Sequence, residues 1–78
     1  MKKFVAIAKT SFERDGWIIS EGEEFTCYYQ KGLPFITVTL RNYNLGYHQF
    51  EMSHEIFLNA FKVDIALERM LKLLKLNS

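Results

Sequence analysis

The chain has 78 residues, of which 49% are hydrophobic and 15% aromatic, and its ten basic and nine acidic side chains leave a net charge of +1. This apolar content excludes an intrinsically disordered segment, and the charge lacks the basic excess of most nucleic-acid-binding domains. The single cysteine, Cys27, excludes an internal disulfide and a cysteine-based zinc site. We therefore expect one small folded domain, mainly β over residues 1–52 and mainly helical over residues 53–78.

The N-terminus combines two lysines with a short apolar run. Lys3–Lys9 is almost continuously apolar, which predicts a strand covered on both faces. Only five apolar residues precede Lys9, whereas a secretory signal needs about 7–15 and a membrane span about 20. We therefore expect a cytoplasmic protein that makes no membrane contact.

The next segment is polar and rich in turn residues. Thr10–Gly16 ends in Asp-Gly and is predicted to be a loop. Trp17–Ser20 is predicted to be a short strand, and Glu21–Glu24 a tight acidic turn.

The clearest predicted hairpin pairs Phe25–Gln30 with Phe35–Arg41 across the turn at Lys31–Pro34. In its second strand Ile36, Val38 and Leu40 alternate with polar residues and are expected to face the core, while Thr37, Thr39 and Arg41 face water.

A turn at Asn42–Gly46 precedes a last strand, Tyr47–Met52. We expect one face of this strand to carry His48, Phe50 and Met52.

From Ser53 onward the apolar pattern becomes helical. Ser53 is a predicted N-cap for a helix at His54–Phe61, which would place Ile56, Phe57, Ala60 and Phe61 on one side. Asp64 either caps a second helix, or the two segments form one long helix.

The C-terminal helix has a broad apolar face, and acidic residues lie early in it and basic residues late, as the helix dipole favours. The face comprises Val63, Ala66, Leu67, Met70, Leu71, Leu73 and Leu74. Either the domain buries all of it, or a part contacts a second copy or another protein. The residues predicted for self-association between Val63 and Leu76 are Met70, Leu71, Leu73 and Leu74.

The order of these elements resembles an SH3-like barrel. Phe4–Ala8 matches the first strand, Thr10–Ile19 the long first loop and Glu21–Phe25 the diverging turn. Tyr47–Met52 and Ser53–Phe61 match the last strand and the helical turn that follows it. The expected fold class is therefore α+β, with a small antiparallel curled sheet or SH3-like barrel of about five strands followed by a C-terminal amphipathic helix.

Two motifs of peptide-binding SH3 domains are missing. Ala8–Phe12 replaces the Ala-Leu-Tyr-Asp-Tyr type motif, and Thr26–Tyr29 replaces the paired tryptophans. The resemblance therefore does not imply recognition of proline-rich ligands. The small size and the absence of familiar motifs also resemble small accessory proteins of phages and mobile elements.

Catalytic and metal chemistry find little support in the sequence. Cys27 with His48 or His54 is the only conceivable nucleophile–base pair, and a cysteine inside a strand is more often a buried structural thiol. The two histidines are six positions apart, which is not a helical metal spacing. We expect no enzymatic activity, no metal and no cofactor.

Aromatic residues near loops and strand ends suggest a binding surface, because such residues dominate interface energetics. They are Trp17, Tyr28, Tyr29, Tyr43 and Tyr47. The acidic turn, with Glu21, Glu23 and Glu24, suits a basic partner if it is not simply a solvated turn. We therefore expect a non-enzymatic protein-interaction module, such as a small inhibitor or modulator of a partner protein.

The alternative is a small nucleic-acid-binding barrel that stacks bases on tyrosines beside a basic groove. Its candidate residues are Tyr28, Lys31, Arg41, Tyr43 and Tyr47. The near-neutral net charge favours the protein-binding hypothesis.

Overall fold

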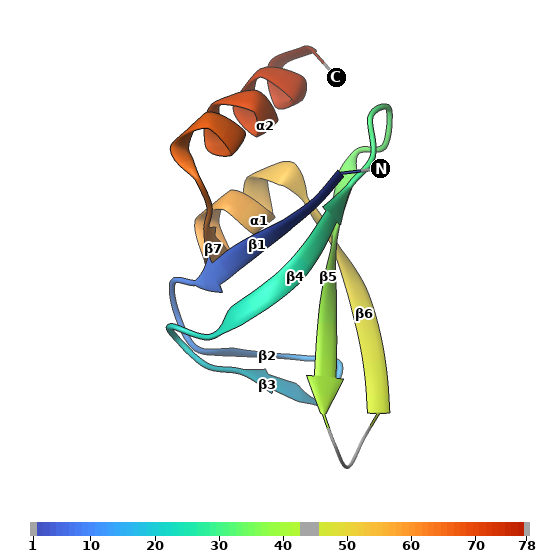
Figure 1. The fold of residues 1–78 in the computed structure, drawn as a ribbon, viewed down its shortest axis with the longest axis vertical. Coiled ribbons are helices and arrows are strands. Elements are labelled where there is room, and N and C mark those ends of the chain that lie inside the picture. Colours follow the sequence, from blue (N-terminus) through green and yellow to red (C-terminus); the bar gives the residue numbers. More distant parts are fainter. Residues whose placement is uncertain (1, 43–45, 78) are drawn as a thin grey trace.

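The computed structural model describes residues 2–42 and 46–77, with side chains described for residues 2–40 and 46–73. These residues form an α+β fold with a five-stranded antiparallel sheet, a separate two-stranded sheet and two helices (Figure 1). In chain order the elements are β1 (Lys2–Ala8), β2 (Phe12–Arg14), β3 (Trp17–Ile19), β4 (Glu24–Tyr29), β5 (Phe35–Asn42), β6 (Gly46–Ser53), α1 (His54–Ala60), β7 (Phe61–Lys62) and α2 (Ile65–Asn77).

The main sheet has the strand order β6-β5-β4-β1-β7, and every pair in it is antiparallel. β6 and β7 lie at opposite edges of the described sheet and do not pair with each other, so the sheet does not close. The prediction of a small curled antiparallel sheet is confirmed, and its alternative, a closed SH3-like barrel, is wrong. Strands β2 and β3 form a hairpin of their own, which crosses one end of the main sheet (Figure 1).

Strand β2 of the β2–β3 hairpin lies in a segment that the sequence predicted to be a loop, whereas β3 confirms the short strand predicted at Trp17–Ser20. Asp15 and Gly16 both have positive φ, at 54° and 84°. A two-residue hairpin turn of this kind suits the right-handed twist of its strands. Phe12 is half-buried and supplies the hairpin's contact with the core. The loop prediction for Thr10–Gly16 was therefore wrong at β2, although its Asp-Gly turn is present.

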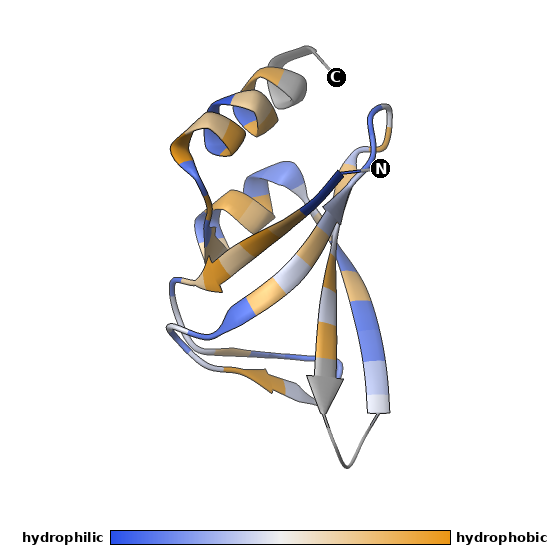
Figure 2. Cartoon of the chain, viewed as in Figure 1, coloured by the Kyte–Doolittle hydropathy of each residue, from blue (hydrophilic) through white to orange (hydrophobic). Residues whose placement is uncertain are grey.

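The core lies between one face of the main sheet, α1 and the hairpin. Alternation places Ile36, Val38 and Leu40 inward, as predicted, and Phe50 and Met52 lie beside them on β6. Figure 2 shows the same alternation of hydropathy along β5. Its remaining buried members are Ala6, Ala8, Ile19, Cys27, Tyr29, Phe57, Leu58, Phe61, Leu67 and Leu71.

Phe61 joins three parts of this core. Its ring stacks on Phe57 of α1 with 5.0 Å between centroids. It also makes edge contacts, at 5.8 Å, with Phe12 of the hairpin and Phe25 of β4. Such geometries add favourable quadrupole interactions to the burial of apolar area.

The first helix is capped as predicted, because the Ser53 hydroxyl accepts a hydrogen bond from the Ile56 amide at 3.3 Å. It buries His54, Phe57 and Leu58, which follow a spacing of three and four residues. The prediction that Ile56 lies on the buried side was wrong, since that side chain is 56% exposed.

The two helical segments do not run together. After Ala60 the chain becomes extended, and Phe61 and Lys62 pair with Ala8 and Ile7 as β7. Asp64 then caps α2, accepting a hydrogen bond from the Ala66 amide at 2.7 Å. Sequence analysis left this choice open and did not predict β7.

Helix α2 packs on α1 rather than across the sheet (Figure 1). Leu67 and Leu71 are its buried contacts, while Ile65 and Leu73 are exposed. The broad face predicted for this helix is therefore only partly covered by the described chain.

β1 is covered on one face only. Ala6 and Ala8 are buried, whereas Val5 on the opposite face is 56% exposed and Ile7 is also exposed. The prediction of a strand covered on both faces was wrong, because in the described structure both helices and the hairpin lie on the other side of the sheet.

Candidate functional site

One face of the main sheet is left uncovered by the helices and the hairpin (Figure 1). The residues that alternate with the buried set point away from the core along four adjacent strands. Their register places Lys3 opposite Tyr28, Tyr28 opposite Thr37, and Thr26 opposite Thr39. We call this surface the open face.

A groove of about 450 Å³ lies on the open face. Thr26 and Thr39 lie on the floor of the groove, where the Thr39 hydroxyl donates a hydrogen bond to the Thr26 carbonyl at 2.6 Å. Tyr47 of β6 is 64% exposed beside it, and Tyr28 of β4 is half-buried. The groove is lined by Lys3, Glu23, Glu24, Phe25, Thr26, Tyr28, Thr39 and Tyr47.

The groove brings together four residues that the sequence predicted for partner binding, namely Tyr28, Tyr47, Glu23 and Glu24. The Glu23 carboxylate accepts a hydrogen bond from the Ser20 amide at 2.8 Å, which fixes the turn before β4. The lining thus carries two carboxylates and one ammonium group, that of Lys3. Its local charge is negative, although the chain as a whole is slightly positive.

Trp17 does not join this groove. It stacks on His48 at 5.5 Å with 6° between the ring planes, where β3 approaches β6. The Asp15 carboxylate lies 3.4 Å from Nε2 of the same histidine. Trp17 is half-buried and connects the hairpin to the main sheet.

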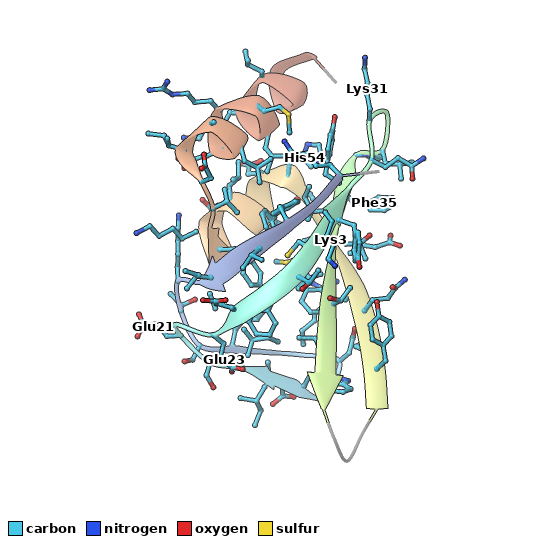
Figure 3. The ribbon with its side chains drawn as sticks, viewed as in Figure 1. Lys3, Glu21, Glu23, Lys31, Phe35 and His54 are labelled. Carbon is cyan, nitrogen blue, oxygen red and sulfur yellow. The ribbon has the colours of Figure 1, made fainter. Side chains whose placement is uncertain are left out.

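The other residues predicted for partner binding are dispersed. Glu21 is exposed at the turn before β4, where its amide donates a hydrogen bond to the Ser11 hydroxyl at 2.9 Å (Figure 3). Tyr29 is buried in the core, so its prediction as a surface residue was wrong. Tyr43 lies outside the described residues.

The backbone positions of the two basic residues in the nucleic-acid alternative lie at opposite ends of β5. Lys31 lies in the β4–β5 turn, at the opposite end of β4 from Glu21 and Glu23 (Figure 3). Arg41 lies at the far end of β5, six residues beyond Phe35. Six residues of strand span about 20 Å, and this length separates Arg41 from the turn that holds Lys31. The side chain of Arg41 lies outside the described part.

The residues predicted for self-association on α2 also divide. Leu71 is 0% exposed and packs within its own chain, so it is available to a partner only if α2 moves. Met70 is half-buried and Leu73 is exposed. The side chain of Leu74 lies outside the described part.

Cys27 is not placed for nucleophilic catalysis. Its thiol is buried in β4, and desolvation raises its pKa to about 12. β5 separates Cys27 from the strand of His48, a separation of about 10 Å across two strand spacings. The described residues contain no group of three or more histidine, cysteine, aspartate or glutamate side chains that could hold a metal ion.

His54 lies at the start of α1, on the side that faces α2 (Figure 3). It is 7% exposed, and its Nε2 has no hydrogen-bond partner among the described residues. The Tyr29 ring lies 6.3 Å from the imidazole. Desolvation by burial lowers the pKa of His54 below its usual value of 6.5.

We expect Cys27 to resist thiol reagents in the native protein at pH 8, because a thiol with a pKa of about 12 supplies almost no thiolate. Labelling with a chromogenic disulfide should be slow without denaturant and rapid in urea. Fast stoichiometric labelling of the folded protein would show that the thiol is accessible and would reopen the catalytic alternative.

Sequence analysis missed part of the groove. In the sequence, Lys3 and the two threonines on the groove floor give no sign of a binding site. They become neighbours only through the pairing of β1, β4 and β5. The alternation in β5 did predict that Thr39 faces away from the core. The register between strands, which brings Thr26 beside it, had no local counterpart in the sequence.

Within the described residues, neither helix has the length and hydrophobicity needed to cross a bilayer. Comparisons with protein-family models, with curated proteins and with solved structures find no match to this chain.

Proposed function

We propose that this domain is a non-enzymatic protein-interaction module that binds a basic segment of a partner protein in the groove of the open face. One observation carries the proposal: the groove brings Tyr47 beside the two carboxylates and Tyr28, although Tyr47 lies 19 positions further along the chain. Tyrosine rings supply contact area and cation–π interactions to lysine or arginine, and the carboxylates add charge complementarity.

A domain of this kind acts by occupying a surface, so it needs no chemistry of its own. The buried thiol of Cys27 supports a role without catalysis. A small inhibitor or modulator that covers the basic surface of a larger protein fits this description. A cytoplasmic location and an origin in a phage or mobile element are part of the same proposal and rest on the sequence alone.

The proposal can be tested with tagged protein captured from cell lysate with and without nuclease. The informative variant is Tyr47→Ala, because the exposed ring can be removed with little effect on folding. We expect a partner that survives nuclease and whose affinity for the variant falls about tenfold or more. Ile18→Ala is the matched control, since Ile18 is 76% exposed but does not line the groove.

Two results would contradict the proposal. Equal capture by wild type and Tyr47→Ala would remove the groove from the binding surface. Recovery of material that disappears with nuclease, and whose binding falls steeply with salt, would instead support the nucleic-acid alternative.

A further inference from the structure

Strand β6 leaves one edge of the main sheet open. It pairs with β5 on one side, and on its other side no described strand pairs with it. In an antiparallel ladder, alternate residues direct both backbone groups away from the neighbouring strand. Arg14 donates a hydrogen bond to the Glu51 carbonyl at 3.0 Å from outside the pair, so Glu51 belongs to this outward set. By the same alternation, Tyr47 and Gln49 present their amide and carbonyl groups to the open edge.

Two opposite charges flank this edge, and within one chain they form an ion pair with 3.9 Å between Arg14 Nε and the Asp15 carboxylate. The Arg14 guanidinium lies 5.0 Å from the centroid of the Phe50 ring. The Asp15 carboxylate lies 3.4 Å from Nε2 of His48, two positions earlier on the strand. A groove of about 390 Å³ runs beside them, lined by Arg14, Asp15, Gln49, Phe50 and Glu51.

We propose that β6 pairs antiparallel with β6 of a second copy of this chain, in a two-fold register that places Gln49 opposite Gln49 of the second copy. In this register Phe50 lies opposite the second copy's His48. Arg14 therefore faces the second copy's Asp15, and the symmetry repeats the pair. Tyr47 lies opposite the second copy's Glu51, so that a phenol donor meets a carboxylate acceptor.

Charge selects this register over its neighbours. If Phe50 lay opposite Phe50 of the second copy, the two Arg14 side chains would face each other. If His48 lay opposite His48, the two Asp15 carboxylates would do so. Like charges directly across a strand pair are destabilising. In a two-fold interface a residue on the axis faces the same residue of the other copy, so a charge there always meets a like charge. Of these three registers, only the one centred on Gln49 sets each Arg14 against an Asp15 of the other copy.

Such pairing would join two five-stranded sheets into one of ten strands and would pair the outward backbone groups of Tyr47 and Gln49, while Arg14 exchanges the Glu51 carbonyl for the second copy's Asp15. It would also place Tyr47 of each copy at the junction between the two β6 strands, so that the two open-face grooves lie next to each other. The pairing shares Tyr47 with the ligand groove, but its other contacts and the Gln49 variants that test it lie outside the groove lining, so the two proposals can fail separately.

The test is the oligomeric state of the full chain, measured by sedimentation velocity up to about 1 mM. We expect a reversible dimer for the wild type. Gln49→Lys and Gln49→Glu each place two like charges opposite one another, which should raise the dissociation constant roughly fivefold or more. An equimolar mixture of the two variants sets lysine opposite glutamate and should recover the dimer.

Ile18→Lys is the control for an added surface charge elsewhere, and it should dimerise like the wild type. Circular dichroism checks that each variant remains folded, which is expected because the Gln49 side chain is exposed. A wild type that stays monomeric throughout the concentration range overturns the proposal. Dimers of unchanged affinity in both Gln49 variants overturn it as well.

Discussion

Replacing Phe61 with alanine should remove a large part of the domain's free energy of unfolding. The ring is 1% exposed and contacts three other phenylalanines, from the hairpin, β4 and α1. A buried phenylalanine-to-alanine change costs about 3–5 kcal/mol, and a domain of this length has a free energy of unfolding of about 4–12 kcal/mol. Urea denaturation followed by far-UV circular dichroism would show a transition shifted to low denaturant or no folded baseline.

The matched control is Ile18→Ala, which removes an exposed side chain and should change the free energy of unfolding by less than about 0.5 kcal/mol. Phe61→Leu retains much of the buried volume and should fall between the two. If Phe61→Ala were as stable as the wild type, the aromatic cluster would not be the point where hairpin, sheet and helix are held together.

Mild acid should destabilise the fold through His54. Burial lowers the pKa of this histidine in the folded state below the value of about 6.5 that it has when unfolded. Between these two pKa values the unfolded chain binds more protons. The free energy of unfolding is therefore not reduced by His54 above pH 6.5. It falls as the pH drops toward the folded-state pKa, by at most about 1.4 kcal/mol per pH unit.

His54→Phe keeps a ring at this position and removes the titration. The difference in unfolding free energy between wild type and variant should therefore depend on pH below 6.5 and become constant above it. His48→Gln serves as the comparison, since it removes the other histidine and should leave that pH dependence in place. Parallel stability curves for wild type and His54→Phe would show that the imidazole does not titrate on unfolding.

Much of the fold could be predicted because its information is local. The alternation in β5, the Ser53 cap and the Asp-Gly turn each act within a few residues. β7 has no such local pattern, because Phe61 and Lys62 become a strand only when β1 is there to pair with them. The exposed face of β1 was missed for a related reason: a continuous apolar run does not tell which face the helices leave uncovered.

The candidate site could be predicted only as residue types. Tyr28 and Tyr47 were identified as interface-type aromatics, but their shared groove depends on the order β6-β5-β4. Trp17 belongs to the same chemical class, yet its stack on His48 places it at the hairpin instead. Register and topology, rather than composition, decide which aromatics meet.

The interior position of β1 in the main sheet has a consequence for synthesis of the protein. This strand is made before the other six, yet its two neighbours are β4 and β7, and the second of these ends at Lys62. Chains emerge at about 5–20 residues per second, so a nascent chain spends seconds with Phe12 and Phe25 made but with Phe61, which packs against both, still missing. The main sheet and its aromatic cluster can thus be completed only after β7 has been made.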